Sequence, residues 1–303
     1  MTQLPIHTPY DGSSKPFAIG LKPLDLKEWT EVDDTFDSQL AEKRRLYAEH
    51  ADRVFVAEEG TEEAQAEVLG LLLDHLPVRF PDRYRRCGED VVITGIPERE
   101  ATDLSPLRKA SLLVQEDLIL MRRGDDGWRL VAGALCFPSS WALTEKFGKP
   151  MSSIHGPVPG FGPGTRNAEL IDRMFDKLQV VQPVVRVNWS IQLGDALYRP
   201  MSNDERNIRK AAPPNRFPDV ESAARAFIRI ERQTLRKLPV SGDILFTIRI
   251  YLDPLSTLKN HPDRAALATS FADQLMELEA EQLDYKGLTA DRDLLVAVLK
   301  GMA

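Results

Sequence analysis

A change of hydrophobic period at the centre of the chain constrains the fold most strongly. In PVVRVNWSIQL apolar and polar residues alternate, so that Arg186, Asn188 and Ser190 share one face. GDILFTIRIYLDP alternates in the same way and places Arg249 on the face opposite Ile250. A period of two predicts β-strands rather than helices. Two further apolar runs, SLLVQEDLILMRR and WRLVAGALCF, flank Gly-Asp-Asp-Gly and predict a hairpin.

Helical periodicity appears on both sides of these strands, as in DTFDSQLAEKRRLYAEH, NAELIDRMFDKLQ and DRDLLVAVLK. The stretch VESAARAFIRIERQTLRKL also predicts a helix, which would place Glu231 on a helix face. Neighbouring strands with a hairpin connection favour an antiparallel sheet, so we expect an α+β fold with helices around that sheet. The expected organisation is an extended N-terminal arm over residues 1–25, a main domain over 26–258 and a C-terminal helical extension over 259–303.

Charge and hydropathy exclude several classes of partner. Asp and Glu number 46 against 39 Lys and Arg, a net charge of -7, and this acidic balance argues against a general nucleic-acid or anionic-membrane binder. The N-terminus, MTQLPIHTPYDG, lacks the basic start and apolar core of a secretory signal. We therefore expect a cytoplasmic protein without nucleic-acid or membrane partners.

Conventional catalytic and metal-binding motifs are missing. The two cysteines, Cys87 and Cys136, lack CxxC spacing and are too few for an iron–sulfur cluster, which usually takes four. The five histidines are scattered, without the spacing of a zinc site. Strict alternation of strands and helices, which a nucleotide-binding sheet requires, is also absent.

The segment SSIHGPVPGFGPG surrounds His155 with glycines and prolines, which favour one specific irregular backbone path. Haem iron needs as few as one protein ligand, so a lone histidine among apolar neighbours such as Pro157 could bind it. The alternative is a loop histidine that bonds a backbone carbonyl. Cys136 is a rival thiolate ligand, although a cysteine in an apolar strand usually behaves as a small hydrophobic residue.

Three long segments, in order along the chain, carry a family resemblance: CFPSSWALTEKFGKPMSSIHGPVPG, RVNWSIQ and RIERQTLRKLPVSGDILFTIRIYLDPL. From about Leu21 to Leu258 the chain resembles the haem-binding α subunit of the haem-dependent oxidative N-demethylases, or dimethylamine monooxygenases. The resemblance implies a PAS-like antiparallel sheet that binds haem b. It also implies a reaction in which dimethylamine, O2 and NADPH-derived electrons give methylamine and formaldehyde.

The resemblance implies that His155 is the proximal iron ligand. Pro157, an apolar neighbour that could line a porphyrin face, is a cofactor-binding candidate. Arg186 and Arg232 are further cofactor-binding candidates. A cationic amine needs a carboxylate, carbonyl or aromatic partner, and Glu231 is the candidate acceptor. The alternative for Glu231 is an ion pair with nearby arginines on a solvated helix face. Asn188 and Arg249 complete the expected catalytic set, as donors to dioxygen or to the haem propionates.

Electrons must come from other chains, because a monooxygenase needs a reductase and this sequence holds neither a dinucleotide fold nor a cluster. The family implies companion subunits that handle NADPH, FMN, an iron–sulfur cluster and folate. We therefore expect a hetero-oligomeric complex that acts on a small amine and O2. Two alternatives remain open at this point: a PAS-like haem protein that senses a gas, and an amine-binding or assembly subunit without haem.

Overall fold

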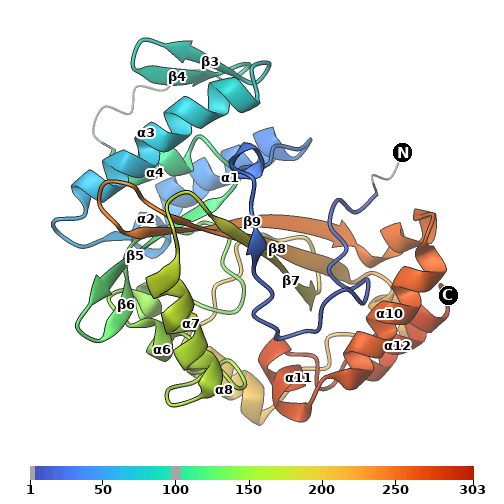
Figure 1. Ribbon diagram of the computed structural model, residues 1–303. Helices are drawn as coiled ribbons and strands as arrows, with labels where there is room; N and C mark the ends of the chain where they lie inside the picture. Colours follow the sequence, from blue (N-terminus) through green and yellow to red (C-terminus); the bar gives the residue numbers. More distant parts are fainter. Residues whose placement is uncertain (1–3, 97–103) are drawn as a thin grey trace.

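A seven-stranded antiparallel sheet organises the computed structural model, which describes residues 4–96 and 104–303. The strands follow the order β1-β7-β8-β9-β5-β6-β2 across this sheet (Figure 1). Its members are β1 (Lys22–Pro23), β2 (Phe55–Ala57), β5 (Asp117–Gly124), β6 (Gly127–Ala134), β7 (Val184–Gln192), β8 (Phe227–Lys237) and β9 (Ile244–Pro254). A separate hairpin pairs β3 (Tyr84–Cys87) with β4 (Asp90–Ile93). The expected α+β class and the hairpin at Gly124–Gly127 are confirmed.

Helices cover both faces of the sheet (Figure 1). Above it in this view lie α1 (Phe36–Glu49), α3 (Glu62–Arg79) and α4 (Pro106–Ser111). Below it lie α6 (Met151–Ile154), α7 (Arg166–Lys177), α8 (Asn203–Ala211) and α11 (Ala280–Lys286), and at one end α10 (Arg264–Glu277) and α12 (Arg292–Lys300). The short elements are α2 (Ala51–Val54), α5 (Leu143–Lys146), α9 (Val220–Ala223), η1 (Leu26–Glu28) and η2 (Leu255–Asn260). Within the described residues, none of the helices has the length and apolar character to cross a bilayer.

The helix expected over VESAARAFIRIERQTLRKL is wrong for most of its length. Only Val220–Ala223 is helical, and Phe227–Lys237 forms the central strand β8. Its residues have good helix propensity, but β8 pairs along nearly its whole length with β7 on one side and β9 on the other. Because these two ladders satisfy the backbone groups on both sides of β8, tertiary pairing overrides the local preference.

Alternation along the central strands sends polar side chains to both faces of the sheet. Arg186 pairs with Gln233, and Asn188 pairs with Glu231, so these four residues share the lower face. We call this the cavity face. Arg232 pairs with Arg249 on the opposite face, which we call the back face.

A buried ionic network occupies the back face. Arg232 Nε lies 3.1 Å from Glu31 Oε1, and Arg249 Nη2 lies 2.7 Å from Asp33 Oδ2. Arg249 is fully buried and also donates to Gln39 Oε1 at 2.9 Å. Although burial opposes ionisation, the Arg249 guanidinium lowers the pKa of Asp33 below its usual value. The network fixes the chain before α1 against the sheet.

We expect Arg249→Ala to lower the free energy of unfolding by about 3–5 kcal/mol, because the substitution leaves the buried Asp33 carboxylate without its cation. Urea denaturation measures this loss. The matched control is Arg225→Ala, since the Arg225 side chain is 66% exposed and its ion pair is with an exposed glutamate. Equal stability of the two variants would contradict a structural role for the back-face network.

Candidate functional site

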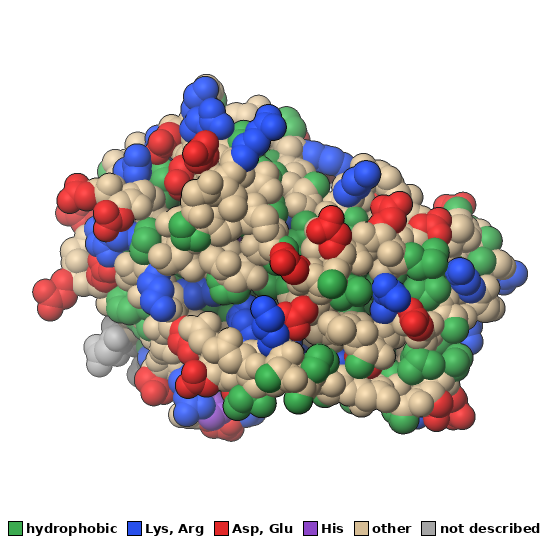
Figure 2. All heavy atoms as spheres, turned by 90° about the horizontal axis from the view of Figure 1, so that it is seen from below, with side chains coloured by type: hydrophobic (Ala, Val, Ile, Leu, Met, Phe, Trp, Pro, Cys, Tyr) green, Lys and Arg blue, Asp and Glu red, His purple; other side chains and the backbone are tan. Residues whose placement is uncertain are grey.

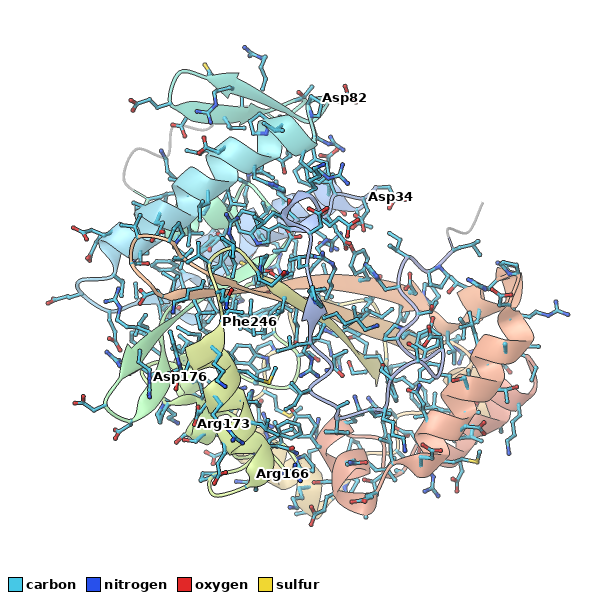
Figure 3. The ribbon with its side chains drawn as sticks, viewed as in Figure 1. Asp34, Asp82, Arg166, Arg173, Asp176 and Phe246 are labelled. Carbon is cyan, nitrogen blue, oxygen red and sulfur yellow. The ribbon has the colours of Figure 1, made fainter. Side chains whose placement is uncertain are left out.

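A cavity of about 260 Å³ lies between the cavity face of the sheet and the helices below it. Phe246, labelled in Figure 3, projects from β9 into this region near α7. Seen from below, the molecule is hollowed near its middle, where Lys and Arg side chains border hydrophobic ones (Figure 2). The wall combines side chains from the N-terminal arm, the central strands and α11, so widely separated parts of the chain build one site.

The polarity of the cavity changes across the sheet. On β7 and β8 the lining is polar except for Leu235, with Arg186, Asn188, Ser190, Glu231 and Gln233. On β9, β5 and β6 it is apolar, with Phe246, Ile248, Ile119, Met121 and Leu130. Because β8 and β9 are neighbours, a charged half directly adjoins an apolar half. Such a cavity suits a flat apolar ligand that carries charge at one edge.

His155 lies at the C-terminal end of α6 and lines the cavity. Its backbone N–H donates to Met151 O at 2.9 Å, and its ring packs edge-on against Phe161 at 6.3 Å between centroids. Within the described part of the chain, no side-chain hydrogen bond holds the imidazole. Burial, followed by the charges of Lys146 and Arg186, lowers the pKa of His155 to about 4. The ring is therefore neutral at pH 7, with a free nitrogen lone pair.

Four cationic side chains line the cavity around a single carboxylate. The cations are Lys146 from α5, Arg186 from β7, Arg206 from α8 and Lys286 from α11, and the carboxylate is Glu231. Burial lowers the pKa of Lys146 to about 7 and that of Lys286 to about 8. Among the described residues, the Arg186 guanidinium has neither a hydrogen bond nor an ion pair, and Arg206 Nε is buried without a partner. This excess of positive charge favours an anionic ligand.

Glu231 projects from β8 into the polar half of the cavity with its side chain 18% exposed. Oε2 accepts a hydrogen bond from Gln233 Nε2 at 2.9 Å. Oε1 lies 3.9 Å from Arg229 Nε, beyond hydrogen-bond distance. One carboxylate oxygen therefore remains able to accept a hydrogen bond from a bound ligand.

The remaining predicted residues lie outside the cavity lining. Arg232 and Arg249 belong to the back-face network, because strand alternation turns them away from Glu231. Pro157 is exposed beside the lining residue Val158. Cys136 is fully buried beyond the end of β6, and burial raises the pKa of its thiol to about 12. A buried thiol that resists ionisation is a structural residue.

Sequence reasoning missed several lining residues. Lys146 and Arg206 lie on short helices, and Tyr285 and Lys286 end α11, more than 100 residues from His155. No motif marks them, since long-range folding alone brings them to the sheet. The described residues contain no group of three or more His, Cys, Asp and Glu side chains that could hold a metal ion directly.

The fold and cavity define an α+β protein with a partly cationic, partly apolar pocket under an antiparallel sheet. The chain belongs to the family described as haem-dependent oxidative N-demethylase, alpha subunit-like, whose model matches residues 20–296. This match includes the whole seven-stranded sheet and α11, and it confirms the family resemblance drawn from the sequence.

We expect Lys146→Met to stabilise the ligand-free protein at pH 6.5 by about 1–3 kcal/mol. The Lys146 ammonium lies 4.2 Å from the centroid of the Trp141 ring but has no hydrogen bond or ion pair within the described chain, so its burial is only partly compensated. The pKa of Lys146 in the folded protein is about 7, below its value in the unfolded chain. At pH values between the two, the unfolded chain therefore binds more protons than the folded protein does. Wild-type stability from this residue therefore rises between pH 7 and about 10, and the advantage of the variant disappears there.

Urea denaturation at pH 6.5 and 9.5 measures this difference. Lys149→Met is the control, since Lys149 is exposed just beyond the end of α5. A Lys146→Met variant that is less stable than wild type at pH 6.5 would show that a favourable contact outweighs the burial of this charge.

Proposed function

We propose that the cavity binds haem b and that the chain is the haem subunit of a monooxygenase that demethylates a small secondary amine, dimethylamine. The neutral, unpaired imidazole of His155 beside an apolar wall carries this proposal. The membership of the chain in a family described as haem-dependent supports it. The antiparallel central strands β6-β5-β9-β8-β7, with the cavity under them, support the PAS-like sheet that the family resemblance implies.

The residues of the cavity fit haem b. Its macrocycle is flat and apolar, and so it suits the lining from β5, β6 and β9. Its two propionates are negatively charged and would balance the excess of basic side chains in the polar half. The unpaired Arg186 guanidinium and the unpaired Nε–H of Arg206, whose Nη2 donates to Ser140 O, would hold the propionates. His155 would supply the axial ligand, since iron needs a neutral imidazole nitrogen.

Haem iron, when bound, supplies the one-electron chemistry with O2 that side chains lack. The residues of the chain bind and orient the amine. Glu231 Oε1 would accept a hydrogen bond from the amine N–H, while Gln233 fixes the other carboxylate oxygen. Asn188, directly across the strand pair from Glu231, would donate its amide N–H to developing negative charge. The apolar wall excludes water from the same space.

Electrons for this reaction would come from partner subunits. The name of the family includes an alpha subunit, which supports a multi-subunit complex. Cys87 is exposed and Cys136 is fully buried, so the two free thiols do not form a shared site. We propose that NADPH, FMN, an iron–sulfur cluster and folate act on companion chains, and that the oxidised methyl group leaves as formaldehyde.

We expect His155→Ala to lose haem or bind it much more weakly while the sheet stays folded, because the substitution removes the axial ligand. Absorption spectra of the reconstituted protein, with reduction and addition of CO, measure haem binding and ligation. The control is His261→Ala, since His261 lies beyond β9 and outside the cavity lining. A normal histidine-ligated spectrum of His155→Ala would assign the axial ligand to another residue.

We expect Glu231→Gln to weaken dimethylamine binding about ten- to a hundredfold with little change in haem binding, because it removes a charge-assisted hydrogen bond but preserves volume. A titration of the haem spectrum with dimethylamine measures the dissociation constant. Glu221→Gln is the control, since the Glu221 side chain is 87% exposed on α9. An unchanged dissociation constant for Glu231→Gln would remove Glu231 from the amine site.

A further inference from the structure

The segment over residues 12–21, which we call the strap, forms one wall of the cavity through Phe17 and Ile19. It runs as the blue coil below β1, in front of the space under the sheet (Figure 1). The Phe17 ring packs edge-on against Tyr285, with 5.7 Å between centroids. The Lys286 ammonium lies 5.2 Å from the centroid of the Phe17 ring. Two neighbouring residues of α11 thus hold the strap in place.

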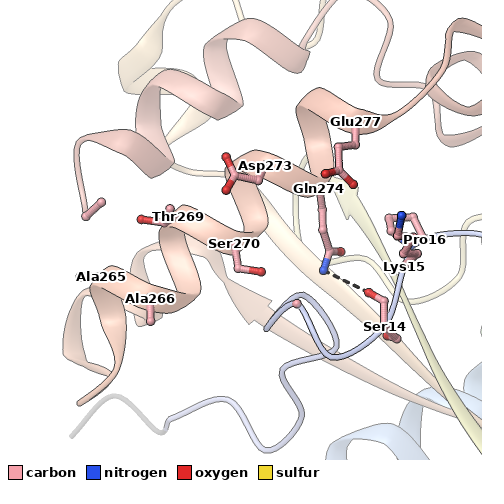
Figure 4. Close-up of a pocket in the computed structure, with 12 residues that line it drawn as sticks. Ser14, Lys15, Pro16, Ala265, Ala266, Thr269, Ser270, Asp273, Gln274 and Glu277 are labelled. Carbon is pink, nitrogen blue, oxygen red and sulfur yellow. Dashed lines mark hydrogen bonds between the residues drawn. The ribbon is translucent and has the colours of Figure 1, made fainter.

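Few backbone interactions hold the middle of the strap. Within the described chain, a single backbone–backbone hydrogen bond joins two strap residues, from Ala18 N to Lys15 O at 3.3 Å. Each end has its own attachment: Gln274 of α10 donates to Ser14 O at 3.3 Å (Figure 4), and β1 pairs with β7 after the strap. The strap is therefore tied at its ends and held in between by side chains.

The backbone of the strap is strained where it meets the cavity. Phe17 has φ 60° and Ser140 has φ 62°, and these are the two non-glycine residues with positive φ in the described chain. Both line the cavity. A bulky residue rarely adopts this conformation, and such strain gathers at ligand clamps and switch regions. Gly12 and Gly20, at φ 89° and 60°, lie on either side of Phe17 and supply flexible positions.

Open space lies on the other side of the strap. Ser14, Lys15 and Pro16 line a hollow of about 630 Å³ together with α10, next to the hydrogen bond from Gln274 to Ser14 O (Figure 4). The strap thus borders two spaces, because its first half lines this hollow and its second half, from Phe17 on, lines the cavity. Outward movement of the first half would enter the hollow once the hydrogen bond from Gln274 to Ser14 O breaks.

We propose that the strap is the gate of the cavity and that Phe17 is the residue that closes it. Tyr285 and Lys286 hold the gate closed through their contacts with the Phe17 ring. Rotation at Gly12 and Gly20 swings the Phe17 ring outward, and ligands enter between β1 and α11. The proposal rests on the proposed function only for the identity of the ligands, haem and a small amine. Gating itself is a property of the strap and can be measured without either ligand.

A thiol placed inside the cavity tests the gate. Ser190 lines the cavity on β7, so Ser190→Cys in a Cys87→Ser background places a nearly isosteric thiol there, while Cys136 stays fully buried. The readout is the rate at which iodoacetamide, a small uncharged reagent, modifies the introduced thiol in the ligand-free full chain. Phe17→Ala should raise this rate about tenfold, as expected from losing one ring–ring and one cation–π contact. Lys286→Met, which removes the ammonium but retains the length of the side chain, should also raise the rate.

Ile6→Ala is the matched control, because Ile6 lies in the same N-terminal segment, is 51% exposed and is outside the cavity lining. The rate should not change in this variant. An unchanged rate in both Phe17→Ala and Lys286→Met, or an equal rise in Ile6→Ala, would overturn the gate. Failure of the protein to bind haem would overturn the proposed function and leave this result intact.

Discussion

The structure depends on a central strand that carries charged side chains to both faces of a buried sheet. On β8, Glu231 points into the cavity and Arg232 points into the back-face network. Burial of a charge is costly unless a partner compensates it. On the back face the compensation is internal, because Glu31 and Asp33 lie within hydrogen-bond distance of Arg232 and Arg249. The cavity face lacks such a balance.

The imbalance in the cavity gives the site its chemical character. Lys146, Arg186, Arg206 and Lys286 face Glu231 alone, and burial lowers the pKa of both lysines. Without a ligand, these buried basic side chains destabilise the folded protein, and for the same reason they favour the binding of an anion. Functional sites commonly combine lower stability with affinity for a ligand in this way. The apolar half of the same cavity limits the anion to one with a large apolar body. The proposed ligand, haem b, would meet both conditions, and the neutral His155 imidazole would supply its axial ligand.

Sequence alone predicted the α+β class, the hairpin at Gly124–Gly127, the strand character of β7 and β9 and the family. It also predicted that Arg186 and Asn188 share a face, because residues two positions apart on a strand lie on the same side of the sheet. It failed on β8, where helix-forming residues concealed a strand that only its two neighbours stabilise. Arg249 was assigned to the site because alternation shows two faces without showing which one borders a cavity. Phe17, Lys146 and Lys286 reach the cavity through tertiary contacts, so no local pattern could reveal them.

The central claim is that the cavity binds a dianionic porphyrin through its uncompensated cations. The most direct measurement compares the affinity of the ligand-free protein for haem b and for haem b dimethyl ester, by absorbance titration at low ionic strength. Esterification removes both charges and keeps the macrocycle and iron. The account predicts one binding site and an affinity for the diester that is lower by about tenfold or more for each lost charge-assisted contact. Equal affinities for the two compounds, or no stoichiometric binding of haem b, would contradict it.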